Sequence, residues 1–245
     1  MKIDAVLSPL ELPSLAARDL SGTACVVFDV LRATSTFVTA LHHGAREIIP
    51  TAEIAEAVDL RRQRPDVLLA GERNGVRIHA AQSGGVDFDF GNSPREFTPD
   101  KVRDKTIIST TTNGTCALRA CARANLILAA SFLNLSATAK FLTESQPVEI
   151  RLICAGTFDS VALEDVLAAG ALADLLAGEF SDPAKIARQT FQRMKSDLPS
   201  AIASSRNGQR LLGIPELRAD VTFCSQRDVF NLVAKMGPDG SIKRV

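Results

Sequence analysis

The sequence predicts an α/β fold with layered α/β/α architecture and a mostly parallel or mixed sheet. Short apolar runs alternate with amphipathic stretches along the whole chain, which is typical of strand–helix units. The 245 residues suit one large domain, and 46% apolar with 23% charged residues is an ordinary globular composition. We therefore treat residues 1–245 as a single domain. If the sheet forms two similar lobes, the spacing of the elements places the break near residues 130–146.

The individual elements follow from the same periodicity. Seven apolar runs are predicted as strands, at residues 3–7, 24–30, 47–49, 67–70, 106–109, 126–130 and 149–154. Six amphipathic stretches are predicted as helices, at residues 34–43, 52–62, 114–123, 134–144, 163–176 and 183–195. Residues 71–99 are rich in Gly, Asn, Ser and Asp, which is typical of a binding or lid segment. The turn at residues 237–240 predicts a terminal hairpin, which we expect at the edge of the sheet.

Composition and charge exclude several kinds of partner. Basic and acidic residues balance at 28 each, and the chain has no Trp or Tyr. We therefore expect no binding to nucleic acid and no attraction to an acidic membrane surface. The N-terminus has no long apolar stretch, and the five cysteines form no C-x-x-C pair, which favours a cytoplasmic protein with buried free thiols. The oligomeric state is not readable from the sequence, and a homo-oligomer is left open.

The most informative turn carries Asp29, Arg32 and three consecutive hydroxyl residues, Thr34, Ser35 and Thr36. Unpaired N–H groups at the start of a helix bind anions, and an arginine can donate two parallel hydrogen bonds to phosphate or sulfonate. Asp29 would repel such an anion unless a cation lay between them, which suggests Mg²⁺. Helix capping by the hydroxyls and turn closure by Asp29 explain this segment equally well.

Two further turns repeat this pattern. Residues 109–115 place five hydroxyls, Asn113 and Gly114 between a strand and a helix, whereas simple capping needs one such residue. The strand at residues 149–154 is followed by Glu164 and Asp165, for which a favourable interaction with the helix dipole is the simpler explanation. Because turns after parallel strands meet at one edge of a sheet, we expect all three turns to converge.

The ends of the irregular segment add four more candidates. Glu72 follows an apolar strand and is a second candidate metal ligand, and Arg73 could hold an anion. Asn92 and Ser93 precede a proline, so the start of a short helix explains them equally well. Arg206 opens another expected helix, and we assign it no role.

Several familiar chemistries are excluded by pattern. The chain has no G-x-x-x-x-G-K-[ST] loop, no G-x-G-x-x-G fingerprint after a strand and no G-x-S-x-G turn. No cysteine has an arginine six positions later, and Asp29 lacks the second aspartate of a D-x-D motif. The three histidines have no metal-ligand spacing.

Four segments together resemble the 2-phosphosulfolactate phosphatase family, which is known from coenzyme M biosynthesis. They are residues 29–36, 71–75, 91–94 and 111–115, and residues 154–156 with 163–165 are similar to a later block of that family. The resemblance covers nearly the whole chain in order and spacing. It implies a fold peculiar to the family, a requirement for Mg²⁺, and hydrolysis of (2R)-O-phospho-3-sulfolactate to 3-sulfolactate and phosphate. The resemblance does not say which residues bind the metal.

The residues and the resemblance fit one hypothesis, because this substrate carries a phosphate, a sulfonate and a carboxylate. We expect Asp29 and Glu72 to bind Mg²⁺, and Asp29 and Arg32 to act in catalysis. The remaining candidates are expected to bind substrate: Thr34, Ser35, Thr36, Arg73, Asn92, Ser93, Thr111, Thr112, Asn113, Gly114 and Thr115. Whether Asp29 attacks phosphorus directly or only binds the metal is left open.

Two alternatives remain at this point. A phosphatase of the same mechanism could act on another small phosphorylated hydroxy acid, because its anion-binding residues would look alike. A non-catalytic anion-binding or sensor protein would be expected to lack the metal carboxylates, whereas Asp29 and Glu72 are both present.

Overall fold

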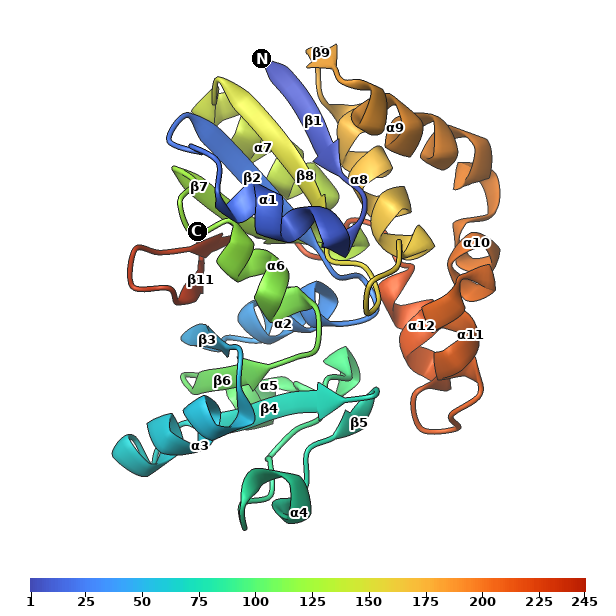
Figure 1. Cartoon of the computed structure of the whole chain (residues 1–245). Helices are drawn as coiled ribbons and strands as arrows, with labels where there is room; N and C mark the ends of the chain where they lie inside the picture. The colour runs from blue at the N-terminus through green and yellow to red at the C-terminus, as the bar shows by residue number, and fades with distance from the viewer.

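The computed structural model describes residues 1–245 and shows one mixed sheet of 11 strands with helices on both faces (Figure 1). This confirms the layered α/β/α prediction. The strands are β1 (Lys2–Val6), β2 (Thr23–Phe28), β3 (Glu47–Thr51), β4 (Leu68–Arg73), β5 (Val76–Arg77), β6 (Thr106–Thr110), β7 (Leu126–Ala130), β8 (Glu149–Cys154), β9 (Glu179–Phe180), β10 (Ala234–Met236) and β11 (Ile242–Arg244). All seven predicted strands are present, β10 and β11 form the predicted terminal hairpin, and β5 and β9 are additional short strands. The predicted lobe boundary stays a prediction.

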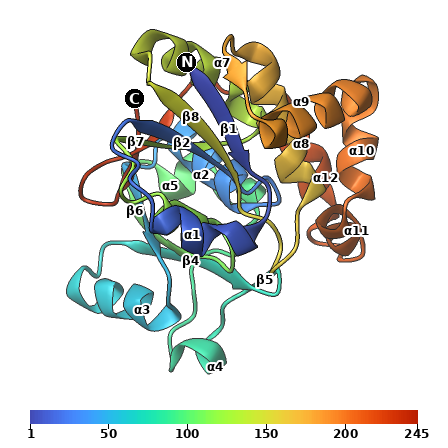
Figure 2. The ribbon, with the colours of Figure 1, turned by 45° about the horizontal axis from the view of Figure 1, so that its top comes forward.

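All six predicted helices are also present within a few residues of their expected ends. The α-helices are α1 (Leu12–Ala16), α2 (Ala33–His42), α3 (Ile54–Gln63), α4 (Ala80–Ser83), α5 (Pro99–Val102), α6 (Gly114–Ala120), α7 (Leu135–Ser145), α8 (Leu163–Leu175), α9 (Asp182–Met194), α10 (Leu198–Ser204), α11 (Arg206–Leu212) and α12 (Arg218–Cys224). None has the length and hydrophobicity that a transmembrane span requires. In Figures 1 and 2, α9 to α12 lie together beyond β1, on the side of the molecule away from α3.

Strand β2 shows how the two large cores form. Its six residues are all buried and alternate between the two faces of the sheet. Val26 and Phe28 pack with apolar residues of α7, α8 and α9 on one face. Cys25 and Val27 pack with α1, α2 and α6 on the other face. A smaller core beneath α3 supports β4 and β6. A strand covered on both faces explains the uninterrupted apolar run in the sequence.

The sheet consists of two parallel blocks joined by the terminal hairpin. The strand order is β5-β4-β6-β3-β11-β10-β7-β2-β8-β1-β9. The pairings β7–β10, β10–β11 and β11–β3 are all antiparallel. The block β3, β4 and β6 therefore runs opposite to the block β1, β2, β7, β8 and β9. The hairpin was predicted correctly, but its expected place at the sheet edge is wrong, because β10 and β11 pair with β7 and β3 in the interior.

The two blocks nevertheless bring their carboxyl ends together. Figure 1 shows β1 and β8 pointing down toward the centre of the molecule, while β4 crosses below them toward α11 and α12. Strand twist accumulates across a large sheet, so strands at its two ends differ greatly in direction. The turns after β2, β4, β6 and β8 therefore face one region, although the sheet is not uniformly parallel.

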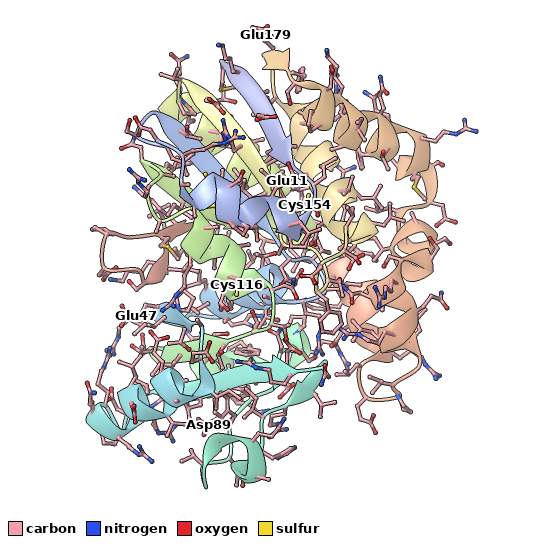
Figure 3. All side chains as sticks on the ribbon, viewed as in Figure 1. Glu11, Glu47, Asp89, Cys116, Cys154 and Glu179 are labelled. Carbon is pink, nitrogen blue, oxygen red and sulfur yellow. The ribbon has the colours of Figure 1, made fainter.

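The cysteines are all free thiols, as expected. Cys25, Cys121, Cys154 and Cys224 are buried. The expectation of burial is wrong for Cys116, which is exposed on α6, and Figure 3 labels it together with Cys154 at the end of β8. A helix that packs on a sheet keeps one face in solvent, and Cys116 lies on that face.

We expect Ile242→Ala to lower the free energy of unfolding by about 2–4 kcal/mol, as measured by urea denaturation. The Ile242 side chain is fully buried in the core, and its backbone pairs with Ile48 of β3. Val245→Ala is the matched control, because Val245 is 59% exposed in the same segment. Equal stability of the two variants would show that the hairpin does not hold the blocks together.

Candidate active site

A polar cavity lies where the turns of both strand blocks meet. Only two of its 14 lining residues are hydrophobic. The lining residues are Asp29, Leu31, Arg32, Glu72, Asn74, Gly75, Asn92, Thr112, Asn113, Gly156, Thr157, Phe158, Asn207 and Arg210. They come from the turns after β2, β4, β6 and β8, from the loop before α5, and from α11. The expected convergence of turns therefore occurs, and α11 adds a wall that the turns alone did not predict.

Asp29 follows β2 and begins the turn into α2. Its Oδ1 accepts a hydrogen bond of 3.1 Å from the Ala33 N–H, and its own N–H donates to Thr34 Oγ1 at 3.0 Å. Its Oδ2 accepts no hydrogen bond from the protein. A Cβ added to Gly114 would lie only 2.7 Å from that Oδ2. The start of α6 can therefore approach the carboxylate this closely only with glycine at position 114.

The surroundings of Asp29 disfavour its ionised form. Burial raises its pKa to about 7, the hydrogen bond from Ala33 opposes this shift, and the charges of Glu72 and Glu164 raise the pKa further. The positive charge of Arg32 acts in the opposite direction and is the smallest of these effects. A cation in the cavity would relieve the repulsion among these carboxylates.

Glu72 is held from two sides and contributes the second cavity carboxylate. It is 8% exposed near the end of β4. Its Oε2 accepts from the Gly75 N–H at 2.6 Å, and its Oε1 accepts from the N–H and the hydroxyl of Thr112 at 3.0 Å each. These bonds fix the carboxylate and tie the turn after β4 to the turn after β6. The side chain is therefore preorganised toward the cavity.

Arg32 lines the cavity, and two of its five N–H donors are engaged by the protein. Its Nη1 lies 2.9 Å from Asp220 Oδ2, and the two side chains are 2% and 0% exposed. Its Nη2 donates to the Gly75 carbonyl at 2.7 Å. The Ser93 hydroxyl donates to Asp220 Oδ1 at 2.7 Å. The guanidinium is thus fixed in place, and a buried aspartate partly neutralises its charge.

Comparison with known proteins identifies the family of the chain. The sequence profile of the family described as 2-phosphosulpholactate phosphatase matches residues 10–238. A protein of Caldanaerobacter subterraneus subsp. tengcongensis is 38% identical over 231 residues, which is 91% of each chain. A protein of Pseudothermotoga lettingae is 40% identical over 221 residues, or 90% of this chain and 92% of the relative. A protein of Clostridium perfringens is 35% identical over 255 aligned positions, covering 100% of this chain and 97% of the relative. Each of these relatives is named "Probable 2-phosphosulfolactate phosphatase".

The chain belongs to the 2-phosphosulfolactate phosphatase family. Membership makes it a phosphoric monoester hydrolase, and it confirms the resemblance that the turns indicated.

The hydroxyls at the start of α2 lie behind the cavity wall. Thr34 Oγ1 donates to the Asp29 carbonyl at 3.0 Å, and Ser35 Oγ donates to the Val30 carbonyl at 2.8 Å. Thr36 Oγ1 donates to the Asn92 carbonyl at 2.8 Å. All three are buried and none lines the cavity. They brace the turn internally by donating to carbonyls, and they do not cap α2, which has no side-chain cap hydrogen bond.

Five other predicted substrate residues also lie outside the lining: Arg73, Ser93, Thr111, Gly114 and Thr115. Arg73 donates to the Glu72 carbonyl at 2.8 Å and to Thr110 Oγ1 at 3.0 Å. Thr111 and Thr115 are buried and bond to each other across the first turn of α6. These side chains stabilise the turns after β4 and β6.

Three predicted residues do reach the cavity: Asn92, Thr112 and Asn113. The Asn113 amide donates to the carbonyls of Ala155 and Phe158, and its oxygen accepts from the Phe158 N–H at 3.2 Å. It thereby holds the loop after β8 against the start of α6. The side chain of Asn92 makes no hydrogen bond within the protein and stays available to a ligand.

Reasoning from sequence missed the functional placement of five polar residues: Glu164, Asp165, Asn207, Arg210 and Asp220. Asp165 is 2% exposed, and its two oxygens accept from the N–H groups of Val30 and Gly156 at 2.8 and 3.0 Å. Burial, followed by the charges of Glu164 and Asp29, raises the pKa of Asp165 well above its ordinary value. The sequence did contain one signal for the acids on α8, namely two adjacent acidic residues at the start of an apolar helix. A favourable interaction with the helix dipole does not require either acid to be buried.

The cavity chemistry fits a magnesium ion. Asp29 and Glu72 are the only acidic residues among the lining residues, and Asp29 Oδ2 is free to act as a ligand. No group of three or more His, Cys, Asp or Glu side chains is placed to hold a metal. Mg²⁺ commonly binds through one or two carboxylates and completes its octahedron with water and phosphate oxygens. Two carboxylates in a polar cavity match that mode.

We expect ionisation of Asp29 to lower the stability of the metal-free protein as pH rises. Because its folded-state pKa is raised, the stabilisation is complete below the unfolded pKa of 3.8 and is lost as pH rises through about 7. Between about pH 4 and pH 8, the free energy of unfolding of Asp29→Asn should decrease by on the order of 3 kcal/mol less than that of the wild type. Urea denaturation in EDTA measures the effect, and an unchanged pH dependence in Asp29→Asn would contradict the assignment.

Proposed function

We propose that this chain is a magnesium-dependent phosphatase that hydrolyses 2-phosphosulfolactate to 3-sulfolactate and inorganic phosphate. The relatives are named for this substrate, and the family covers residues 10–238. The observation that carries the proposal is the shared cavity, in which Asp29 and Glu72 of opposite strand blocks lie with Arg32 and Arg210. Carboxylates and guanidinium groups together suit a reaction in which a multiply charged anion meets a divalent cation.

Asp29 and Glu72 are the residues that would hold the metal. The carboxylates alone would repel a phosphate ester, and the raised pKa of Asp29 reflects the same accumulation of negative charge. Bound Mg²⁺ would neutralise phosphoryl oxygens and increase the electrophilicity of phosphorus. Glu72 is fixed by three hydrogen bonds, so it needs little reorganisation when the substrate arrives.

Arg32 contributes a fixed positive charge beside Asp29. The buried contact with Asp220 and the bond to the Gly75 carbonyl prevent the guanidinium from swinging away. Such preorganised charge favours the transition state, in which negative charge on the phosphoryl group shifts toward the leaving oxygen. Asn92 and the side chains on α11 remain to orient the rest of the substrate.

The direct test is phosphate release from racemic phosphosulfolactate, phospholactate and phosphoglycolate, each with Mg²⁺ and with EDTA. We expect magnesium-dependent release that is strongest for phosphosulfolactate. Stronger release from phospholactate would assign the same chemistry to another phosphorylated hydroxy acid. No release from any ester by folded protein would favour an anion-binding protein without catalysis.

We expect Asp29→Asn to lower kcat by about 100-fold or more while the far-ultraviolet circular dichroism spectrum stays unchanged. The amide can still accept the Ala33 hydrogen bond, but it loses the charge that would bind the metal. Asp66→Asn is the matched control, because Asp66 is exposed and makes no hydrogen bond or ion pair. Near-full activity of folded Asp29→Asn would contradict the assignment of Asp29 as a metal ligand.

A further inference from the structure

Helix α11 forms one wall of the cavity and carries two polar side chains toward it. Asn207 and Arg210 are three residues apart on α11, so they lie on the same face, and both line the cavity. The Asn207 amide donates to Thr157 Oγ1, and it donates to Glu164 Oε1 at 2.7 Å. The wall is therefore anchored to the loop after β8 and to the start of α8.

Unsatisfied polar atoms are concentrated on this wall. Only four buried side-chain nitrogen or oxygen atoms in the protein lack a hydrogen-bond partner: Thr98 Oγ1, Glu164 Oε2, Asn207 Oδ1 and Arg210 Nε. Two of the four belong to this wall, and a third belongs to Glu164 on α8, which accepts a hydrogen bond from Asn207. A buried polar atom without a partner is destabilising, so native proteins rarely leave several together unless a ligand or water completes them.

Arg210 differs from the other arginines near the site. Arg32 is paired with Asp220 and the Gly75 carbonyl, and Arg73 bonds to Thr110 and to backbone carbonyls. Arg210 makes no hydrogen bond and no ion pair, although its Nε is buried and its guanidinium lies beside Gly75. It is thus the one cavity arginine whose charge and donors are uncommitted. A planar guanidinium in this state is suited to two parallel hydrogen bonds with an oxyanion.

The charges in the cavity indicate which oxyanion Arg210 would bind. The phosphoryl group belongs with the metal that Asp29 and Glu72 would hold, and the substrate carboxylate is itself a good oxygen ligand for magnesium. A sulfonate is a much weaker base than a carboxylate and competes poorly for a metal, yet it remains fully ionised. Its three oxygens can still accept the paired N–H groups of a guanidinium.

We propose that Arg210 binds the sulfonate of the substrate and determines the preference for sulfonated phosphate esters. This assignment rests on the proposed function and extends it. It assigns recognition of the substrate to the sulfonate, which is distinct from the phosphoryl group that is transferred. Asn207 positions the α11 wall through Glu164 and Thr157, so that Arg210 faces the cavity.

The test compares two substrates that differ only at the sulfonate. Phospholactate has a methyl group where phosphosulfolactate has the sulfonated methylene. We expect Arg210→Gln to lower kcat/KM for phosphosulfolactate by about 100-fold and to change kcat/KM for phospholactate by less than about threefold. Arg206→Gln, at an exposed position on the same helix and outside the cavity, is the matched control and should leave both values unchanged.

A second measurement reads binding directly. Inhibition by 3-sulfolactate should weaken by about 100-fold in Arg210→Gln, whereas inhibition by inorganic phosphate should stay at the wild-type value. Thermal denaturation of the variant establishes that it is folded.

The outcomes separate the assignment from the proposed function. Equal losses on both substrates would place Arg210 at the phosphoryl or carboxylate group and overturn the assignment. Retention of wild-type kcat/KM for phosphosulfolactate by Arg210→Gln would overturn it as well, with the proposed function intact. Wild-type protein that releases phosphate from neither ester would overturn the proposed function and the assignment together.

Discussion

The architecture of this site depends on buried carboxylates whose hydrogen-bond partners lie on other segments of the chain. Glu72 joins the turn after β4 to the turn after β6 through Thr112. Asp165 joins the turn after β2 to the turn after β8 through the N–H groups of Val30 and Gly156. Asp220 joins α12 to Arg32 and Ser93. A buried carboxylate is tolerated only when its oxygens are compensated, so each of these residues fixes the position of two other segments.

The same arrangement concentrates negative charge around the cavity. Each carboxylate that braces a turn also makes ionisation of the neighbouring carboxylates less favourable. The pKa values of Asp29 and Asp165 are both raised, first by burial and then by the negative charges nearby. Structural and chemical roles are therefore coupled, because removing one acid changes both the loop positions and the charge available to a cation. Arg32 is held within this acidic region by a buried contact with Asp220.

The terminal hairpin solves a separate problem of chain geometry. Two parallel blocks of opposite direction cannot pair directly as parallel neighbours, and β10 and β11 supply the antiparallel connection between them. The twist of the sheet then turns the carboxyl ends of both blocks toward one region of the molecule (Figure 1), and the residues lining the cavity come from there. Residues near the C-terminus thus help to position a site whose two carboxylates, Asp29 and Glu72, lie much earlier in the sequence.

The sequence by itself determined the elements, the family and part of the site. Apolar periodicity located seven strands and six helices because burial on both faces imposes a run such as that of β2. The turns after β2, β4 and β6, together with the loop before α5, identified six residues that line the cavity: Asp29, Arg32, Glu72, Asn92, Thr112 and Asn113. Local composition was informative there because polar residues directly after an apolar strand have few purely structural reasons to accumulate.

Only the tertiary structure decided which of the polar residues face the cavity. Thr34, Ser35, Thr36 and Arg73 have the right chemistry to bind an anion, yet their donors are engaged by nearby backbone and side chains. Arg210 and Asp220 lie far along the chain in short helices without any local motif. The physical reason is that a hydrogen-bond donor is available to a ligand only if nothing in the folded chain occupies it. Contacts between distant segments decide which donors are free, and the spacing of residues in the sequence does not reveal those contacts.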